Sequence, residues 1–387
     1  MSLPLSLYIH IPWCVQKCPY CDFNSHQKKG EIPESEYISH LLDDLSTDID
    51  RFMLTGQERR DVPRVISSIF IGGGTPSLLS VAGMHRLLSG VKERMTVAEN
   101  AEVTMEANPG TVEADKFAGF VDSGINRISI GVQSFDSSHL QKLGRIHDGQ
   151  QAVRAIELAR ALPLRSFNTD LMHGLPNQTP EQALHDLQTS IDLNAPHISW
   201  YQLTIEPNTQ FYSQPPVLPN DEILWDIQEK GQALLAKNGY RQYEVSAYCK
   251  SEQQSKHNLN YWRFGDYMGI GCGAHGKLTD NATGKITRTV KVKHPKGYMD
   301  LSKPYLYSEN DIETSEIAFE FFMNRFRLLE ACPQNDYAKY TLSLLSNEEN
   351  VVLQRAVNKG LLASSATHWR VTELGRRYLN TLLAEFV

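Results

Sequence analysis

The sequence has few cysteines, no excess of basic residues and no long apolar run, and each absence excludes a class of protein. Six cysteines among 387 residues are too few for a disulfide framework, so we expect a protein of a reducing compartment, the cytoplasm. A net charge of −7, from 38 basic and 45 acidic residues, predicts no nucleic-acid partner. Because no apolar segment reaches the length of a membrane span, only peripheral membrane association is left open.

Short apolar segments rich in β-branched residues alternate with amphipathic segments through the first 240 residues. The predicted strands are Leu5–Ile11, Val65–Ile71, Glu102–Met105, Arg127–Val132, Ser166–Leu171 and Ile198–Leu203. The predicted helices are Glu34–Leu54, Val81–Arg94, Gly149–Ala161, Pro180–Leu193 and Asp221–Lys237. This alternation predicts an α/β fold with right-handed βαβ units around a parallel sheet. Six such units form a partial (β/α)6 TIM-like barrel, whose ligands bind at the carboxyl ends of the strands.

The pattern changes twice after the barrel and predicts three parts of the chain. Residues 1–240 form the barrel, residues 241–307 a mixed connecting region, and residues 308–387 a smaller, mostly helical C-terminal domain. In that last domain, Glu313–Leu329 reads as one amphipathic helix, and a short strand at His368–Val371 precedes a final helix. This order predicts a winged-helix-like domain.

Three cysteines spaced C-x3-C-x2-C follow the first predicted strand. They are Cys14, Cys18 and Cys21. Thiolates this close together indicate a metal centre, and a [4Fe–4S] cluster, which normally takes four protein ligands, would keep one iron open for a small chelating molecule. The alternative is a structural zinc site, with His10 or His26 as the fourth ligand. Tyr20 favours the cluster, because an aromatic ring at this position can lie along an adenine.

Glycine-rich or polar motifs end the later strands, where a barrel binds its ligands. The turn Gly72–Pro76 can bring a ligand close to the backbone, and its N–H groups can hold a carboxylate. Glu106 follows the third strand and can accept hydrogen bonds from a ligand; the alternative is that this segment caps the next helix. Gln133 and Asp170 end the next two strands and suit contacts to adenosine and ribose hydroxyls.

A second motif lies in the connecting region, at His257-Asn258-Leu259-Asn260-Tyr261-Trp262. A histidine beside two flat aromatic rings offers an axial iron ligand and a surface for a tetrapyrrole. From these residues alone, a structural histidine among core aromatic side chains is the favoured alternative.

Taken together, these motifs resemble the HemN-type radical S-adenosylmethionine (SAM) superfamily, and the resemblance covers essentially the whole chain. One branch contains oxygen-independent coproporphyrinogen III dehydrogenases, and another the HemW-type haem chaperones. The dehydrogenase pattern has a further cysteine where this chain has Phe23, and a long arm where only 13 residues precede Cys14. The H-N-x-x-Y-W motif of the HemW type matches residues 257–262 at every fixed position. The resemblance therefore favours the chaperone branch and overturns the structural interpretation of His257.

The resemblance implies a set of site residues and cofactors. The [4Fe–4S] ligands would be Cys14, Cys18 and Cys21. The SAM contacts would be Tyr8, Tyr20, Gly73, Gly74, Thr75, Glu106, Gln133, Arg145, Asp170 and Thr204. The haem site would contain His257, Asn258, Tyr261 and Trp262.

The implied function is a haem chaperone that delivers haem to haem-requiring apoproteins, by analogy respiratory ones, without catalytic turnover. The alternative is an oxygen-independent coproporphyrinogen III dehydrogenase, or another radical SAM enzyme acting on a tetrapyrrole. We further expect that Gly74→Val blocks SAM while sparing the cluster. The sequence leaves open whether SAM is cleaved, whether one or two SAM molecules bind, and whether the protein forms a homodimer.

Overall fold

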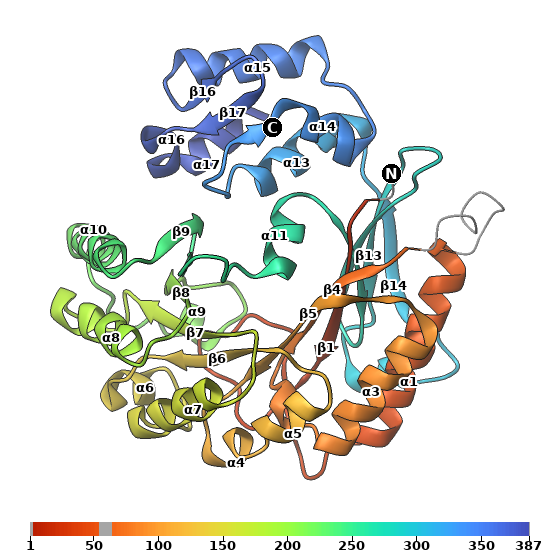
Figure 1. Cartoon of the computed structure of the whole chain (residues 1–387), viewed down its shortest axis with the longest axis vertical. Coiled ribbons are helices and arrows are strands. Elements are labelled where there is room, and N and C mark those ends of the chain that lie inside the picture. Colours follow the sequence, from red (N-terminus) through yellow and green to blue (C-terminus); the bar gives the residue numbers. More distant parts are fainter. Residues whose placement is uncertain (1–2, 54–63, 387) are drawn as a thin grey trace.

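A computed structural model describes residues 3–53 and 64–386. Its core is a curved twelve-stranded sheet with the order β14-β13-β12-β11-β1-β4-β5-β6-β7-β8-β10-β9 (Figure 1). Six parallel strands in chain order form its middle: β1 (Leu5–Ile11), β4 (Ile66–Gly73), β5 (Val97–Ala107), β6 (Arg127–Gln133), β7 (Ser166–His173) and β8 (His197–Gln202). The prediction of a parallel α/β partial barrel is confirmed, and β1 has the predicted bounds.

Helices cover the outer face of this sheet (Figure 1). The long ones are α1 (Glu34–Asp48), α3 (Val81–Arg94), α7 (Gly149–Ala161), α8 (Pro180–Asp192) and α10 (Asp221–Lys237). The predicted bounds of α3, α7 and α10 are confirmed. A π-helical turn, Ile49–Met53, follows α1; Leu54, the predicted end of this helix, lies outside the described residues. Within the described ranges, no helix is long and apolar enough to cross a membrane.

Alternate residues of the parallel strands face opposite sides of the sheet. In β1, Leu5, Leu7 and Ile9 are buried in the core that the outer helices share. The residues between them are polar: Ser6 lies opposite Ser68 of β4, and Tyr8 and His10 line a cavity on the concave side. The outer face therefore carries the hydrophobic core, and the concave face carries polar side chains.

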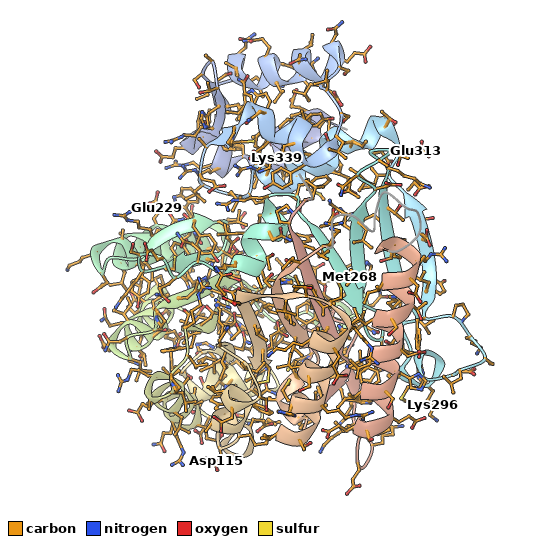
Figure 2. All side chains as sticks on the ribbon, turned by 45° about the vertical axis from the view of Figure 1, so that its right-hand side comes forward. Asp115, Glu229, Met268, Lys296, Glu313 and Lys339 are labelled. Atoms are coloured by element: carbon orange, nitrogen blue, oxygen red, sulfur yellow. The ribbon has the colours of Figure 1, made fainter. Side chains whose placement is uncertain are left out.

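The segment 241–307 extends the sheet at both of its edges. At one edge, β9 (Arg241–Glu244) and β10 (Ala247–Cys249) continue antiparallel beyond β8. The chain then crosses the open side as α11 (Lys256–Trp262) and returns as β11 (Asp266–Ile270), parallel to β1. Met268, labelled in Figure 2, lies on β11. Its side chain is fully buried. The strands β12 (His275–Thr279), β13 (Ile286–Lys291) and β14 (Leu306–Asp311) follow in antiparallel order.

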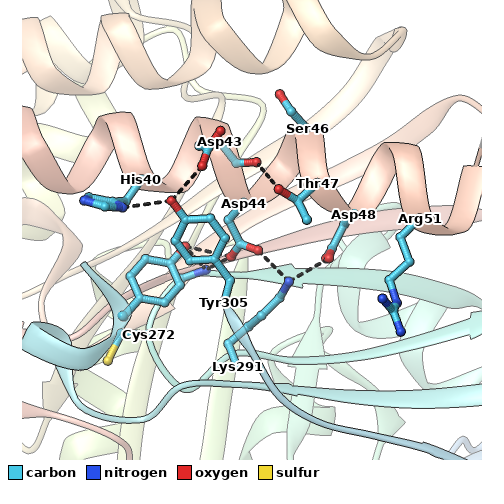
Figure 3. Close-up of polar contacts among 12 residues, drawn as sticks. His40, Asp43, Asp44, Ser46, Thr47, Asp48, Arg51, Cys272, Lys291 and Tyr305 are labelled. Atoms are coloured by element: carbon cyan, nitrogen blue, oxygen red, sulfur yellow. Dashed lines mark hydrogen bonds and ion pairs between the residues drawn. The ribbon is translucent and has the colours of Figure 1, made fainter. Parts of the chain in front are cut away.

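A buried lysine fastens the outer helix α1 to β13 (Figure 3). Lys291 Nζ lies 2.5 Å from Asp44 Oδ1 and 2.7 Å from Asp48 Oδ1, and all three side chains are essentially unexposed. The Tyr298 hydroxyl donates to Asp44 Oδ2 at 2.6 Å. Burying charges is costly unless they are paired and hydrogen-bonded, as these are.

The C-terminal domain packs above the barrel, next to α11 (Figure 1). Its elements are α13 (Ile317–Arg325), β15 (Cys332–Pro333), α14 (Gln334–Thr341), α15 (Asn347–Asn358), β16 (Leu362–Ser364), β17 (His368–Val371), α16 (Glu373–Arg377) and α17 (Leu379–Leu383). The strand prediction at His368–Val371 is confirmed; it is the middle of a three-stranded antiparallel sheet. The single helix predicted over Glu313–Leu329 is wrong in length. A 3-10 turn at Thr314–Glu316 comes first, and α13 follows it and ends at Arg325.

Candidate functional site

The three motif cysteines lie on the loop that follows β1. Cys14 ends the short strand β2 (Trp13–Cys14), which pairs with β3 (His26–Gln27). All three thiols are free and line one cavity. The pKa of Cys14 is raised by burial and also by the neighbouring Cys21 and Cys18 thiols, and Arg145 Nη1 lies 3.7 Å from Cys18 Sγ. Three converging thiols beside a fixed cation suit a three-ligand cluster.

The zinc alternative required a histidine as fourth ligand. Both ring nitrogens of His10 are already engaged, because Nδ1 pairs with the Tyr8 hydroxyl at 2.9 Å and Nε2 with the Asn24 carbonyl oxygen at 2.9 Å. His26 Nε2 faces the carbonyl oxygen of Lys293 at 3.3 Å. These contacts disfavour a zinc site with His10 as a ligand.

The cysteine cavity has a volume of about 290 Å³ and gathers residues from five neighbouring parallel strands, β4 to β8. The predicted SAM residues that line it are Tyr20, Gly73, Gly74, Thr75, Glu106, Gln133, Arg145 and Asp170. Tyr8 lines the neighbouring cavity instead. Thr204 lines neither of these two cavities, and its hydroxyl donates to Glu206 Oε1 at 2.9 Å.

Glu106 and Asp170 put two carboxyl groups into this cavity. Burial, and then the charge of Asp170, raise the pKa of Glu106 to about 8. Burial also raises the pKa of Asp170, although Ser129 Oγ and Asn168 Nδ2 donate to it at 2.8 and 2.7 Å. Glu106 Oε2 accepts a hydrogen bond from the backbone N–H of Gly73 at 3.0 Å, so it ties the glycine turn to β5 rather than capping the next helix.

Gln133 has a left-handed backbone, with φ of 66°, at the end of β6. The pairing with β7 shifts register at this point, and the Gln133 side chain accepts a hydrogen bond from the Tyr201 hydroxyl at 2.7 Å. A non-glycine residue in this region is uncommon and is found at ligand sites. Tyr201 and Asn108, whose Oδ1 accepts from Arg145 Nη2 at 2.6 Å, also line the cavity; sequence reasoning did not select them.

A larger cavity of about 960 Å³ lies directly beside the cysteine cavity. The residues that line both are Lys17, Cys21, Phe23, Ser25, Gly73 and Glu106. Of the predicted haem residues, His257 and Tyr261 line it, whereas Asn258 and Trp262 do not. The ring of Trp262 packs 5.0 Å from that of Tyr261 and 5.4 Å from the Arg327 guanidinium. Lining residues that sequence reasoning did not select include His275, Tyr267 and Lys293.

His257 is held in place by residues of the barrel. Its Nδ1 lies 3.2 Å from Ser68 Oγ, and its ring centroid lies 5.1 Å from that of Phe70. Burial lowers the pKa of His257 to about 4, because an imidazolium is poorly solvated in this position. The side chain is therefore neutral at physiological pH.

The partial barrel and its three-cysteine cavity define a radical SAM protein. In agreement, residues 8–189 match the model of the radical SAM superfamily, and residues 312–378 match that of the HemN C-terminal domain. The chain belongs to the HemW family. It is 57% identical to the heme chaperone HemW of Escherichia coli K12, over 99% of this chain and 98% of that protein. It is 33% identical to the heme chaperone HemW of Bacillus subtilis 168, over 99% of both chains.

A solved structure has the same fold. The coproporphyrinogen III oxidase HemN from Escherichia coli, described as a radical SAM enzyme, superimposes with a TM-score of 0.82 over 100% of this chain and 90% of its own. Its sequence is 22% identical, so the likeness concerns the fold. Membership of the radical SAM superfamily implies a [4Fe–4S] cluster and SAM as cofactors.

Proposed function

We propose that this protein is a haem chaperone, which binds haem in the larger cavity with His257 as an axial ligand and delivers it to haem-requiring apoproteins. The observation that carries the proposal is a partly buried, neutral histidine at the wall of a cavity of about 960 Å³. This cavity is also contiguous with the site of the three cysteines, since both are lined by Cys21. The names of the full-length relatives support the same function.

The environment of His257 suits an iron ligand. When Nδ1 of His257 carries the proton and donates it to Ser68 Oγ, the free lone pair is on Nε2, where it can bind iron. Metal-binding histidines are commonly held by such a hydrogen bond from their other ring nitrogen. Within the part of the chain that the structure describes, Nε2 makes no hydrogen bond to protein. A pKa of about 4 keeps protons from competing with iron at neutral pH.

The rest of the cavity wall suits a flat dianionic macrocycle. Tyr261, Tyr267 and Phe23 offer aromatic surface, and Lys17 and Lys293 offer positive charge for carboxylates. Trp262 acts indirectly, by packing against Tyr261. Asn258 contacts the helix start through its backbone, whose N–H donates to the Ser255 hydroxyl at 3.3 Å, and this contact gives its side chain no role in haem binding.

The cysteine cavity would hold the cluster and SAM. Cys14, Cys18 and Cys21 would be the cluster ligands, and a bound, reduced cluster supplies an electron for SAM chemistry in this superfamily. The turn at Gly73 and Gly74 would receive the methionine end of SAM, and Glu106 with Asp170 its cationic and hydroxyl groups. Tyr20, Thr75, Gln133 and Arg145 complete this wall.

The test is an anaerobic haem titration followed by Soret absorbance on the reconstituted protein. The variants are His257→Ala and, as a control, His185→Ala, which removes an exposed histidine of α8. We expect saturable binding by wild type and His185→Ala, and at least tenfold weaker binding with a shifted Soret band for His257→Ala. Unchanged binding by His257→Ala would move the site elsewhere. Absence of specific binding by wild type, or robust conversion of coproporphyrinogen III, would overturn the chaperone proposal.

A further inference from the structure

Glu102 is a buried carboxylate that lines neither cavity. It lies on β5, four residues before Glu106, and faces the concave side of the sheet, where α11 crosses the barrel. Its carboxylate accepts three hydrogen bonds, all from the start of α11. The donors are Ser255 Oγ at 3.2 Å, the Lys256 N–H at 3.1 Å and the His257 N–H at 3.1 Å.

These contacts satisfy the first backbone N–H groups of the helix that carries His257. The N–H groups of a first helical turn have no partner within the helix and carry partial positive charge. Here the Ser255 N–H donates to the Tyr243 hydroxyl at 3.3 Å, and the Asn258 N–H to the Ser255 hydroxyl. Glu102 accepts from the two N–H groups between them, including that of His257 itself.

The ring of His257 is oriented from a second strand. Ser68 Oγ, which pairs with Nδ1, also pairs with Ser6 Oγ at 2.8 Å. The Asn260 side chain donates to the same Ser6 hydroxyl at 2.8 Å. The backbone of His257 is thus hydrogen-bonded to the Glu102 carboxylate on β5. Its ring is hydrogen-bonded to the Ser68 hydroxyl on β4, and its helix is hydrogen-bonded through Asn260 to the Ser6 hydroxyl on β1.

We infer that Glu102 is a positioning residue for the haem ligand: it holds the backbone of His257 so that Nε2 faces the larger cavity. The inference rests on the proposed haem site. Glu102 touches neither cavity, so it acts only through α11. A negative charge at this helix start gives stronger hydrogen bonds than a neutral acceptor would.

The experiment compares Glu102→Ala, Glu102→Gln and the control Glu99→Ala in the full-length, reconstituted protein. Glu99 lies on the same strand with an exposed side chain. Haem affinity and the Soret spectrum are measured beside cluster absorbance and SAM affinity. We expect Glu102→Ala to weaken haem binding about five- to fiftyfold and to shift the Soret band towards that of His257→Ala. Glu102→Gln, which keeps one acceptor oxygen, should show a smaller change, and cluster and SAM readings should stay at wild-type values.

The outcomes separate this inference from the proposed function. If His257→Ala changes the Soret band while Glu102→Ala and Glu102→Gln both keep the wild-type band and affinity, Glu102 has no positioning role and the haem site stands. If His257→Ala has no effect, the haem site and this inference fail together. Should Glu102→Ala fail to fold, the near-isosteric Glu102→Gln decides: a wild-type Soret band and affinity would overturn the inference.

Discussion

At the scale of single residues, two opposing influences set the charge of Glu106 and Asp170, the two carboxyl groups of the cysteine cavity: burial and a bound cation. Burial favours their neutral forms, and it raises the pKa of Glu106 to about 8 and that of Asp170 above its ordinary value. A cation in the cavity would favour the charged forms instead. The protonation state of Glu106 therefore depends on what occupies the site.

We predict that SAM binding releases protons near pH 7. Glu106 with a pKa of about 8 is mostly protonated in the free protein at this pH. The positive charge of SAM lowers that pKa, so the carboxyl group ionises on binding and a proton leaves. Calorimetry in buffers with different ionisation enthalpies measures the number released, which should approach one near pH 7 and fall as the pH rises through about 8.

The matched variant for this measurement is Glu106→Gln, which keeps the size of the side chain and cannot ionise. Its SAM binding should release clearly fewer protons than that of the wild type. Binding heats of the wild-type protein that are independent of the buffer would contradict the prediction.

Residues that belong to a sequence motif can be found from the sequence. Residues that reach the site only because strands pair cannot be found in this way. The cysteines follow β1, Gly73 and Glu106 lie at the ends of β4 and β5, and Asp170 lies in the second half of β7. Their meeting at one cavity can therefore be predicted from the parallel fold. Tyr201 and Glu102 sit in ordinary strand sequence, and only the register of neighbouring strands and the crossing of α11 give them partners. The left-handed backbone of Gln133 has no signal in the sequence either.

At the scale of elements, the glycine turn after β4 is packed against the cysteine loop. The Gly74 N–H donates to the carbonyl oxygen of Ile11 at 2.7 Å. A Cβ atom on Gly74 would lie 2.5 Å from the carbonyl oxygen of Trp13, the residue before Cys14. Gly73 is equally restricted, with φ of +112° and a Cβ position 2.5 Å from the His10 ring.

We therefore predict that Gly74→Ala impairs cluster retention as well as SAM binding. The added methyl group must displace the backbone of Trp13 and, with it, Cys14, the first of the three proposed cluster ligands. This replaces the expectation, made from the motif alone, that a larger residue at Gly74 would spare the cluster. The measurement is the visible absorbance per protein after anaerobic reconstitution, which should fall to half of the wild-type value or less.

Gly297→Ala is the control for this prediction, because its Cβ would meet only the Val292 side chain at 3.2 Å. It should reconstitute like the wild type. A Gly74→Ala protein with a full cluster and weakened SAM binding would contradict this prediction and support the earlier expectation that a larger residue at Gly74 blocks SAM but spares the cluster.

Periodicity predicts elements well where the local sequence decides their ends, as in α3, α7 and α10. It is wrong for the helix expected over Glu313–Leu329, because contacts with a distant strand end that helix early. The Leu329 N–H donates to the Tyr243 carbonyl oxygen at 3.0 Å, and Leu328 forms a bridge with Glu244. The placement of residues 241–307 at both sheet edges likewise depends on pairing between strands far apart in sequence.

At the scale of the whole molecule, the buried Lys291 joins the outer helix layer to the antiparallel edge of the sheet (Figure 3). Removing one partner of a buried ion group leaves uncompensated charge, at a cost of about 3–5 kcal/mol. Burial raises the pKa of Asp48 to about 6 even with the lysine present.

We predict that Lys291→Met lowers the free energy of unfolding by about 3–5 kcal/mol at pH 7, because Asp44 and Asp48 lose their cation. Urea unfolding followed by circular dichroism measures the change. Lys285→Met is the control: it removes an exposed lysine paired with Asp311 at 2.8 Å and should leave the unfolding midpoint near that of wild type. Equal midpoints for the two variants would contradict a role of the buried cluster in stability.

The position of β1 in the sheet has a consequence for biosynthesis. Although β1 is synthesised first among the sheet strands, its two neighbours are β4 and β11, and β11 begins only at Asp266. Because synthesis proceeds from the N-terminus, roughly two thirds of the chain must leave the ribosome before β1 loses its unpaired edge. The loop with the three cysteines meets Cys272 and Lys293 later still, through Asn24. We therefore expect the proposed cluster to be assembled on this loop only after the chain has been synthesised at least as far as Lys293.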